Sequence, residues 1–367
     1  MIRLTTLLAE SKLKLNIPPD IKNLHKLFKQ NGKQLYVVGG AVRDAILGNT
    51  PKDFDLTTDA KPEEVEAIAK QGGYKTVDVG KSFGVVVVNG HEIATFRKDI
   101  GKGRRPDAVD YTDIKGDVKR RDLTINALFY DLGREEIVDL VGGLSDIKKK
   151  KIRTVGDPKQ RFDEDPLRKM RAVRFAATVG GSMSKDTWNA LRQSPSLKGI
   201  SSERIRDEFI KGILKAGLVG AYLKMLTKLG MWKDIFPGLI INQKHNNKIK
   251  DYKVQIANIL KGNPSDKVLS KLKSLSYTVQ EVRDIVHLIK LKEFSSKDIY
   301  IIKKEQAVTK LKPQQIKMWA SIVGKNILKI WKFKLSVQSK EAISQGYKGK
   351  QIGDYIKQRE TELFDSK

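Results

Sequence analysis

The sequence predicts a small mixed α/β head followed by an all-helical remainder. Short apolar runs such as residues 35–38 and 83–88 alternate with helical patterns in the first part of the chain, which is typical of an α/β domain. From residue 217 onward only helical spacing appears, interrupted by Gly, Pro, Asn and Ser, and there is no repeat or low-complexity tract. A chain of 367 residues is long enough for about two to four domains with a sizeable core.

The composition indicates a polyanionic partner. The formal net charge is +28, and an excess of this size favours nucleic acid or an acidic membrane, although a basic surface kept for solubility would also produce it. The absence of cysteine rules out disulfides and thiolate metal sites and fits a cytoplasmic protein. No apolar run approaches the roughly 20 residues needed to cross a bilayer. Residues 1–17 lack the apolar core of a secretion signal, although they could form a short amphipathic helix.

Hydrophobic spacing and turn residues define the expected elements of the head. Apolar residues at helical spacing predict a helix over 19–31, and a short helix over about 41–47 is expected after Gly39 and Gly40, ending at Gly48. A proline near its start, two acidic residues in its first turn and two glycines beyond its end predict a further helix over 61–70. Strands are expected at 35–38, around Asp53 and Asp55, and at 76–79, 83–88, 92–96 and 137–140.

The stretch over residues 35–58 carries the first candidate site. Its strand runs into Gly39 and Gly40, where missing side chains let backbone N–H groups approach a ligand closely. The next strand carries Asp53 and Asp55, which leave the same face because they are two residues apart. Folding gives no reason to place two like charges so close, but a pair of divalent cations does. Each feature alone would be an ordinary turn or strand edge. Together they indicate a nucleotide held near a metal-bound carboxylate pair.

The segment over residues 97–116 is polar, Gly-rich and basic. It has no hydrophobic period, so we expect a mobile loop. A second basic run follows at 148–151 with Arg153, and it is either a solvated face or part of an RNA path.

The stretch DVKRRDLTINALFYD over residues 117–131 carries the second candidate site. Arg120 and Arg121 are suited to phosphate, and Asp122 is suited to a ribose hydroxyl. Asn126 could add a contact to sugar or phosphate. As structure, the stretch predicts a helix that Asp122 caps and at whose start an anion would dock, with three buried apolar residues, Ile125, Leu128 and Phe129.

The stretch RFDEDPLRKMRAVRFAATVG over residues 161–180 predicts a helix that begins near Pro166 with Asp165 as its N-cap. Three arginines recur every three residues and share one face of this helix: Arg168, Arg171 and Arg174. They repel each other unless a bound anion or nearby carboxylates neutralise their charge. A carboxylate can accept from the exocyclic amine that cytosine and adenine share, and a guanidinium can donate to the neighbouring ring nitrogen. Uracil and guanine invert this pattern, so Asp165 with Arg168 could select C and A. Arg171 and Arg174 are left for phosphate or for structural pairing.

These motifs together resemble the catalytic signature of the DNA polymerase β-type nucleotidyltransferases. More narrowly, they resemble the bacterial-type (class II) CCA-adding tRNA nucleotidyltransferases and the bacterial poly(A) polymerases. RRDLTINA is similar to the RRDFTINA motif of that family, with Leu123 in place of Phe, and EDPLRKMRAVRFAA matches its EDxxR motif. The resemblance is strong over residues 35–215 and only positional beyond them.

The resemblance implies a fold and a domain order. The head would be the α/β catalytic head of the polymerase β-type nucleotidyltransferase fold, followed by all-α neck, body and tail domains. The expected boundaries are 1–135 for the head, 136–215 for the neck with base recognition, 216–290 for the body and 291–367 for a basic tail that binds tRNA.

The resemblance also implies roles for single residues. Asp53 and Asp55 would hold two Mg²⁺ ions, and Glu92 in HEIATFR would be a third metal-facing carboxylate unless it points to solvent. Phosphates would be cradled by Gly39, Gly40, Arg43 and Arg121. In the family, the loop over 97–116 helps the switch from C to A addition, and its typical end matches Gly103, Arg104, Arg105 and Pro106. A mainly structural element is expected around Glu203, Arg204 and Glu208.

The implied activity is the template-independent addition of C, C and A to the 3′ end of tRNA from CTP and ATP, with release of pyrophosphate. A poly(A) polymerase, or an enzyme that adds only CC or only A, shares these motifs. An RNA-binding protein with an inactive transferase head would explain the charge but would not need the whole motif set. No obligate protein partner is evident, and the isolated His245 and His287 give no phosphohydrolase metal motif. Four aromatic residues are expected in the core rather than as base-stacking platforms: Trp319, Trp331, Phe333 and Tyr347.

Overall fold

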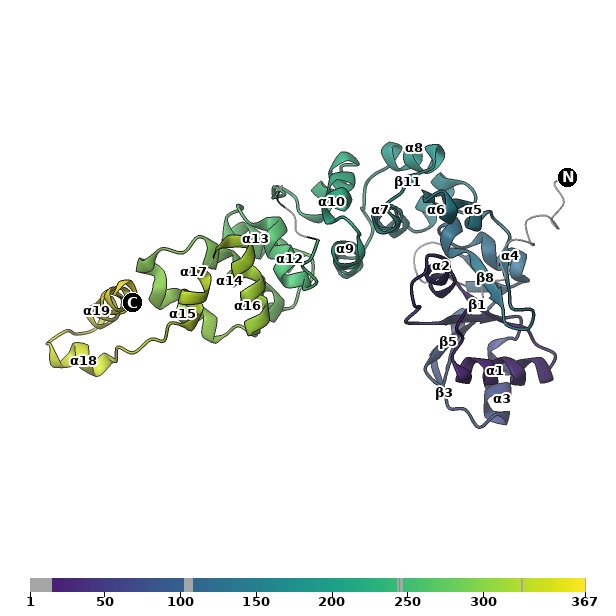
Figure 1. Cartoon of the computed structure of the whole chain (residues 1–367), viewed down its shortest axis with the longest axis horizontal. Helices are drawn as coiled ribbons and strands as arrows, with labels where there is room; N and C mark the ends of the chain where they lie inside the picture. Colours follow the sequence, from purple (N-terminus) through teal and green to yellow (C-terminus); the bar gives the residue numbers. More distant parts are fainter. Residues whose placement is uncertain (1–14, 102–107, 243, 245–246, 325, 367) are drawn as a thin grey trace. The chain divides into compact units, whose positions relative to one another are not determined.

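The chain consists of two compact units, residues 1–198 and 199–367, in a computed structural model that describes residues 15–101, 108–242, 244, 247–324 and 326–366 (Figure 1). The first unit holds a mixed sheet with helices, and the described part of the second unit contains helices and no strands. The predicted fold class, an α/β head followed by helical domains, is confirmed. No helix among the described residues is long and apolar enough to cross a membrane.

A seven-stranded sheet forms the centre of the first unit, in the order β3-β4-β5-β2-β1-β8-β9. β2 and β5 run parallel, and the other neighbouring strands run antiparallel. The strands are β1 (Leu35–Val38), β2 (Asp55–Thr58), β3 (Thr76–Gly80), β4 (Val85–Val88), β5 (His91–Thr95), β8 (Leu128–Asp131) and β9 (Glu136–Asp139). The fully buried strand β1 pairs with β2 on one side and β8 on the other, so the two motif-bearing stretches lie side by side at the middle of the sheet.

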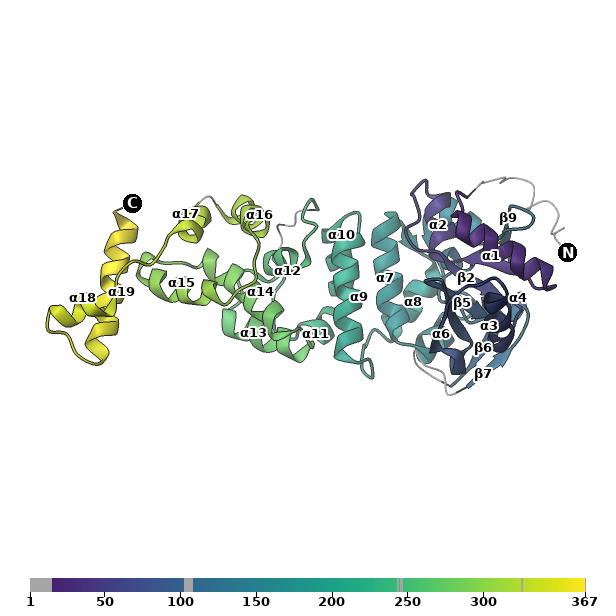
Figure 2. The same ribbon diagram turned by 90° about the horizontal axis from the view of Figure 1, so that it is seen from below.

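Three predicted helices of the head are present: α1 (Pro19–Gln30), α2 (Gly40–Ile46) and α3 (Pro62–Gln71). Ile21, Leu24 and Phe28 lie on one face of α1 and are completely buried, which is why this amphipathic stretch folds onto the protein. α1 and α3 lie against each other, as Figure 2 also shows. Two strand boundaries differ from expectation: Phe83 lies in a short 3₁₀ turn, η1 (Lys81–Phe83), and Asp53 lies just before β2.

The segment over residues 97–116, predicted as a mobile loop, forms regular secondary structure in the part that the structure describes, so its assignment as a loop is wrong there. β6 (Arg97–Ile100) and β7 (Ala108–Tyr111) form an antiparallel two-stranded sheet, and α4 (Ile114–Lys119) follows. Most side chains of both strands are exposed, so the pairing leaves no alternation of apolar and polar residues in the sequence. The segment matched to the family loop, Gly103, Arg104, Arg105 and Pro106, lies outside the described residues.

The helix expected after Asp122 is also absent. The chain forms one 3₁₀ turn, η2 (Thr124–Asn126), and then enters β8, which pairs with β1 and β9. Ile125, Leu128 and Phe129 are buried as predicted. The spacing of buried residues was therefore interpreted correctly, but pairing with two distant strands overrode the helical pattern.

The rest of the first unit carries the long motif helix. The helix predicted near Pro166 is present as α7 (Leu167–Val179), and it begins directly after Pro166. It is preceded by α5 (Gly143–Lys148), β10 (Lys151–Ile152) and α6 (Pro158–Glu164), and followed by β11 (Ser182–Met183) and α8 (Lys185–Gln193). β10 and β11 pair in parallel, which ties the chain after α7 back to the segment before α6.

The second unit is helical throughout its described residues, as predicted. Its helices are α9 (Ser202–Lys215), α10 (Val219–Lys228), α11 (Trp232–Ile235), α12 (Tyr252–Leu260), α13 (Ser265–Ser274), α14 (Val279–Lys292), η3 (Ser296–Asp298), α15 (Ile299–Ala307), α16 (Pro313–Val323), α17 (Asn326–Lys332), α18 (Ser339–Ser344) and α19 (Lys350–Asp365). Trp319 and Phe333 are buried as expected, and Trp331 is half-buried. Tyr347 is 39% exposed, so its assignment to the core is wrong. The four-part division of the chain stays a prediction.

Candidate nucleotide-binding site

The end of strand β1 brings the first motif next to the second. Gly39 follows β1 with φ 74°, a backbone conformation that favours glycine, and its N–H donates to the carbonyl of Leu128. A Cβ at Gly39 would lie 3.5 Å from the carbonyl oxygen of Asn126 and 3.9 Å from Nη1 of Arg121. The Gly39–Gly40 turn therefore lies against the RRDLTINA segment, in agreement with a shared site.

The paired carboxylates lie beside this turn. Asp55 opens β2 opposite Val38, the last residue of β1. Partial burial raises the pKa of the Asp55 carboxyl, Arg121 opposes that effect, and the neighbouring Asp53 raises the pKa further. Asp53 and Asp55 are thus close enough to repel each other, which a divalent cation would relieve.

Glu92 lies on the neighbouring strand. Because Leu56 pairs with Ile93 in the parallel β2–β5 ladder, Glu92 occupies the position next to Asp55. Among the residues that the structure describes, no group of three or more His, Cys, Asp and Glu side chains is placed to hold a metal ion. The assignment of Glu92 as a third metal-facing carboxylate stays a prediction.

A buried carboxylate that the sequence reasoning missed orients the motif arginines. Asp117 is completely buried and accepts from Nε of Arg120 at 2.8 Å and from Nη2 of Arg121 at 2.8 Å. Burial raises the pKa of the Asp117 carboxyl, but the attraction of the two guanidinium groups outweighs burial and keeps the pKa below its usual range. Arg121 also lies over the ring of Phe129 at 4.9 Å. An Asp with arginines three and four residues later was the sequence signal that could have revealed this anchor.

Four predicted site residues form one chain of hydrogen bonds across three elements. Arg43 on α2 donates to the amide oxygen of Asn126, and the Asn126 amide donates to Oδ1 of Asp122 at 3.3 Å. Arg171 on α7 donates from Nε to Oδ2 of Asp122 at 2.6 Å. Burial raises the pKa of Asp122, but pairing with Arg171 outweighs it and lowers the pKa. The chain fixes α2, η2 and α7 around one surface.

An aromatic ring gathers three cations at the same place. The guanidinium carbons of Arg43, Arg171 and Arg174 lie 4.8, 5.6 and 4.1 Å from the ring centroid of the buried Phe175. Cation–π attraction offsets part of the repulsion between the arginines while preserving their positive charge. Sequence reasoning counted Phe175 only as part of a motif. Such a group of guanidinium cations is suited to a polyphosphate.

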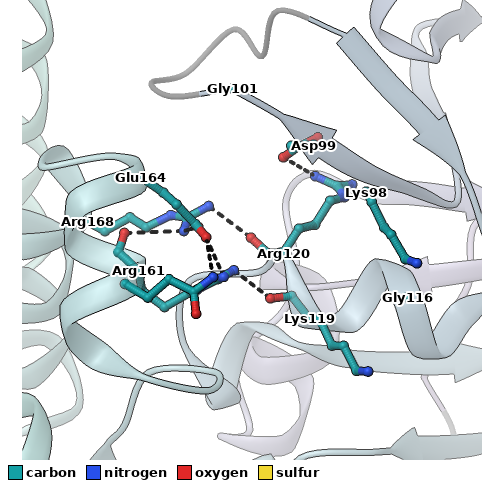
Figure 3. A pocket seen from close by; sticks show the side chains of 10 residues that line it. Lys98, Asp99, Gly101, Gly116, Lys119, Arg120, Arg161, Glu164 and Arg168 are labelled. Atoms are coloured by element: carbon teal, nitrogen blue, oxygen red, sulfur yellow. Dashed lines mark hydrogen bonds and ion pairs between the residues drawn. The ribbon is translucent and has the colours of Figure 1, made fainter.

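The predicted base-reading pair lies at the junction of α6 and α7. Asp165 is buried, and its carboxylate accepts from the backbone N–H of Leu167, the first residue of α7, at 3.1 Å. Its assignment as the N-cap is wrong by one residue, because Pro166 is the N-cap of α7 and Asp165 ends α6. Arg168 donates to Oε2 of Glu164 at 2.7 Å and to the carbonyl of Arg120 at 2.9 Å (Figure 3). Glu164, which sequence reasoning also missed, additionally pairs with Arg161.

A cavity of about 220 Å³ opens between this junction and the β6–β7 hairpin with α4 (Figure 3). Arg168 lines it, whereas Asp165 does not. The other lining residues are Lys98, Asp99, Gly101, Gly116, Lys119, Arg120, Gln160, Arg161 and Glu164. The structure thus brings Gly39, Gly40, Arg43, Asp53, Asp55, Arg121, Asp122, Asn126, Arg171 and Arg174 to one surface and turns Arg168 toward an adjoining cavity.

Comparison with known proteins agrees with this geometry. Residues 35–153 match the poly A polymerase head domain family, and residues 182–241 match a family described as the probable RNA and SrmB-binding site of polymerase A. A CCA-adding enzyme of Bacillus licheniformis is 43% identical over 219 residues, which cover 58% of this chain and 53% of that protein. A CCA-adding enzyme of Ligilactobacillus salivarius is also 43% identical, over 54% of this chain and 51% of its own.

The chain is similar to bacterial-type CCA-adding enzymes, and its residues 35–153 match the poly A polymerase head domain. It spans about half the length of the curated relatives it matches. The structure of a CCA-adding enzyme of Bacillus stearothermophilus in complex with CTP superimposes with a TM-score of 0.70 at 26% identity, over 95% of this chain and 93% of that one. A Thermotoga maritima CCA-adding enzyme complexed with tRNA shares the fold, with a TM-score of 0.66 at 21% identity over 97% and 94% of the two chains.

Proposed function

We propose that this protein adds C, C and A, in that order, to the 3′ end of tRNA, using CTP and ATP and releasing pyrophosphate. The observation that carries the proposal is the continuous contact from Arg43 through Asn126 and Asp122 to Arg171, beside the carboxylates of Asp53 and Asp55. This arrangement offers donors for a triphosphate and acceptors for its counter-ions on one surface. A tRNA-processing enzyme of this kind would act in the cytoplasm.

Asp53 and Asp55 fit a divalent cation, and Mg²⁺ is the ion we propose. Both side chains are carboxylates, which are the oxygen ligands that Mg²⁺ prefers. They repel each other, and a bound cation would relieve that repulsion. Bound metal would lower the pKa of the attacking 3′-hydroxyl and neutralise the triphosphate. Glu92 stays our candidate for a third ligand because of its place next to Asp55 in the β2–β5 ladder.

The cationic side chains would hold the triphosphate and the sugar. The Gly39–Gly40 turn lies beside Arg121 and Arg43, since a Cβ at Gly39 would be 3.9 Å from Nη1 of Arg121 and one at Gly40 would be 3.8 Å from Nη2 of Arg43. Arg43, Arg171 and Arg174 gather around Phe175. The Asp122 carboxylate accepts three N–H groups, from Leu123, Asn126 and Arg171. A carboxylate has about four acceptor positions. One position therefore remains for a ribose hydroxyl, which agrees with the role proposed for Asp122.

Base selection would rest on Asp165 and Arg168. Glu164 and the carbonyls of Arg161 and Arg120 fix the plane of the Arg168 guanidinium and engage three of its N–H groups. A guanidinium has five, so donors remain for the ring nitrogen that cytosine and adenine share. The Asp165 carboxylate would accept from the exocyclic amine. A base with the inverse pattern would place an acceptor opposite the carboxylate and a donor opposite the guanidinium, so neither hydrogen bond would form and binding would be strongly disfavoured.

The test is nucleotide addition to tRNA transcripts that end before, within or after CCA, with each nucleotide supplied singly and together. We expect two additions from CTP, one from ATP only after both, and then no further extension. A ladder of adenosines on tRNA or on an unstructured oligonucleotide, with no use of CTP, would identify a poly(A) polymerase instead. A product that stops at CC, or that begins only from CC, would identify a partial enzyme.

A further inference from the structure

The C-terminal pair of helices, α18 and α19, presents an aromatic surface that the proposed chemistry does not use. Tyr347 lies in the segment that connects the two helices, which are drawn in yellow in Figure 1. Its ring is 39% exposed and lies 4.9 Å from the ring of Tyr355, with 35° between the ring planes. Tyr347 is therefore supported by a second ring while a large part of its surface faces solvent.

The backbone fixes the position of Tyr347. The N–H of Tyr347 donates to the carbonyl of Ala342, and the N–H of Gly346 donates to the carbonyl of Ile343. With Gly346 at φ 89°, this is a Schellman motif that ends α18 and places Tyr347 directly after the helix. Because Ala342 is completely buried, the motif is anchored in the fold, and Tyr347 is presented by an ordered turn.

Side-chain contacts fix the supporting ring as well. The hydroxyl of Tyr355 donates to Oε1 of Glu341 at 2.8 Å and accepts from Nε2 of Gln345 at 2.9 Å. Both partners belong to the α18 end of the pair, so Tyr355 on α19 joins the two helices. The contact also engages the Glu341 carboxylate, the last acidic group before Tyr347 in the sequence.

The charge next to the ring is positive. Residues 342–353 contain Lys348 and Lys350 and no acidic residue. Both lysines are exposed, one and three positions after Tyr347. An exposed, supported aromatic ring with adjacent cations is the combination that single-stranded nucleic acid binds, since bases stack on the ring while phosphates approach the cations.

We propose that Tyr347, supported by Tyr355, is a stacking platform for an unpaired base of the RNA substrate, with Lys348 and Lys350 binding the phosphates beside that base. The identity of the RNA as tRNA rests on the proposed function. The neighbouring Ile343 is 57% exposed, so an apolar contact with a protein is the other use of this surface that the test must separate. The two lysines beside the ring favour RNA.

The experiment measures the Kd of labelled tRNA for the full chain at fixed salt, using variants at Tyr347. Aromatic stacking on a base is worth enough that Tyr347→Ala should weaken binding roughly fivefold or more. Tyr347→Phe keeps the ring and should bind within about twofold of the wild type, whereas Tyr347→Leu keeps apolar bulk without a π face and should lose affinity like the alanine variant. Ile343→Ala is the matched control on the same surface and should leave the Kd unchanged. The double variant Lys348→Gln/Lys350→Gln should weaken binding and reduce the salt slope by about two.

The outcomes separate the platform from the proposed activity. Equal tRNA affinity for wild type and Tyr347→Ala overturns the platform, whether or not the protein extends tRNA. Retained affinity in Tyr347→Leu, or lost affinity in Ile343→Ala, overturns stacking in favour of an apolar docking surface. Failure of the proposed function appears instead as wild-type protein that adds no nucleotides, and the same variants then test the platform on its RNA affinity alone. Thermal melting checks the fold, and if Tyr347→Ala melts early, the Phe and Leu variants decide the result because both retain bulk.

Discussion

Replacement of Asp117 by asparagine should destabilise the first unit and weaken nucleotide binding together. The carboxylate is completely buried and forms charge-assisted hydrogen bonds with Arg120 and Arg121. An amide of the same size cannot carry the negative charge, so Arg121 would lose the carboxylate it is bonded to and Arg120 would keep only Asp99, at 3.7 Å. Breaking a buried ion pair by removing one partner costs about 3–5 kcal/mol.

The expected magnitude is smaller than the upper limit of that range. The side chains of Arg120 and Arg121 are 19% and 15% exposed, so water can partly solvate them once the carboxylate is gone. We therefore expect a loss of about 3 kcal/mol in the free energy of unfolding, a large share of the roughly 5–15 kcal/mol that stabilises a domain. Since Arg121 also lies beside Gly39, the KM for CTP should rise by about tenfold, the equivalent of 1.4 kcal/mol.

Urea unfolding followed by circular dichroism measures the stability change, with Asp163→Asn as the matched control on the exposed surface of α6. The pKa of Asp117 is lowered in the folded state, so its stabilisation is present above its unfolded pKa of about 4 and is lost as pH falls through the lower folded pKa. The difference in the free energy of unfolding between wild type and Asp117→Asn should therefore be constant from about pH 5 to 8 and become smaller below pH 4. A variant within about 0.5 kcal/mol of the wild type at pH 7 would refute the reasoning.

Two further predictions concern single groups elsewhere. Asp55→Asn should abolish incorporation of both C and A while changing tRNA affinity little, because one metal site would serve both nucleotides. Gel assays with each nucleotide check this, and a variant that loses incorporation of only one nucleotide contradicts a single metal site. Burial lowers the pKa of His287 on α14 to about 4, so the free energy of unfolding of the wild type should fall as pH drops from about 6.5 toward 4. In urea titrations, His287→Leu should remove about 3 kcal/mol of that pH dependence. An unchanged pH profile in His287→Leu would show that other groups cause it.

Sequence patterns over a few residues predicted the helices, whose buried residues lie close together in the sequence. α1 was found from the spacing of apolar residues, and α7 from that spacing and from Pro166, because a helix buries residues that are three or four apart in the sequence. The β6–β7 hairpin was not found, because its two strands are exposed and pair across a turn without an apolar face. β8 was mistaken for a helix because its burial comes from strands β1 and β9, which lie far away in the sequence.

The candidate site shows the same division. The charged residues that resemble family motifs were predicted by type and spacing, but the groups that orient them were not. Asp117, Glu164 and Phe175 act through contacts that only the folded chain creates. Tyr347 was placed in the core as aromatic residues usually are, although the polar, Gly-rich stretch SQGYKGK around it is typical of an exposed turn, which is where the structure has it.

The carboxylates of this site orient cations rather than cancel their charge. Asp117 engages Arg121, Asp122 engages Arg171 and Glu164 engages Arg168, each through one or two of the five N–H groups of a guanidinium. The remaining donors keep their direction because the ion pair fixes the plane of the group. An incoming triphosphate would thus meet guanidinium groups that are already aligned, so little reorganisation is needed when it binds. It follows that an amide at these positions should harm binding by misaligning an arginine, even though the substitution makes the site more positive.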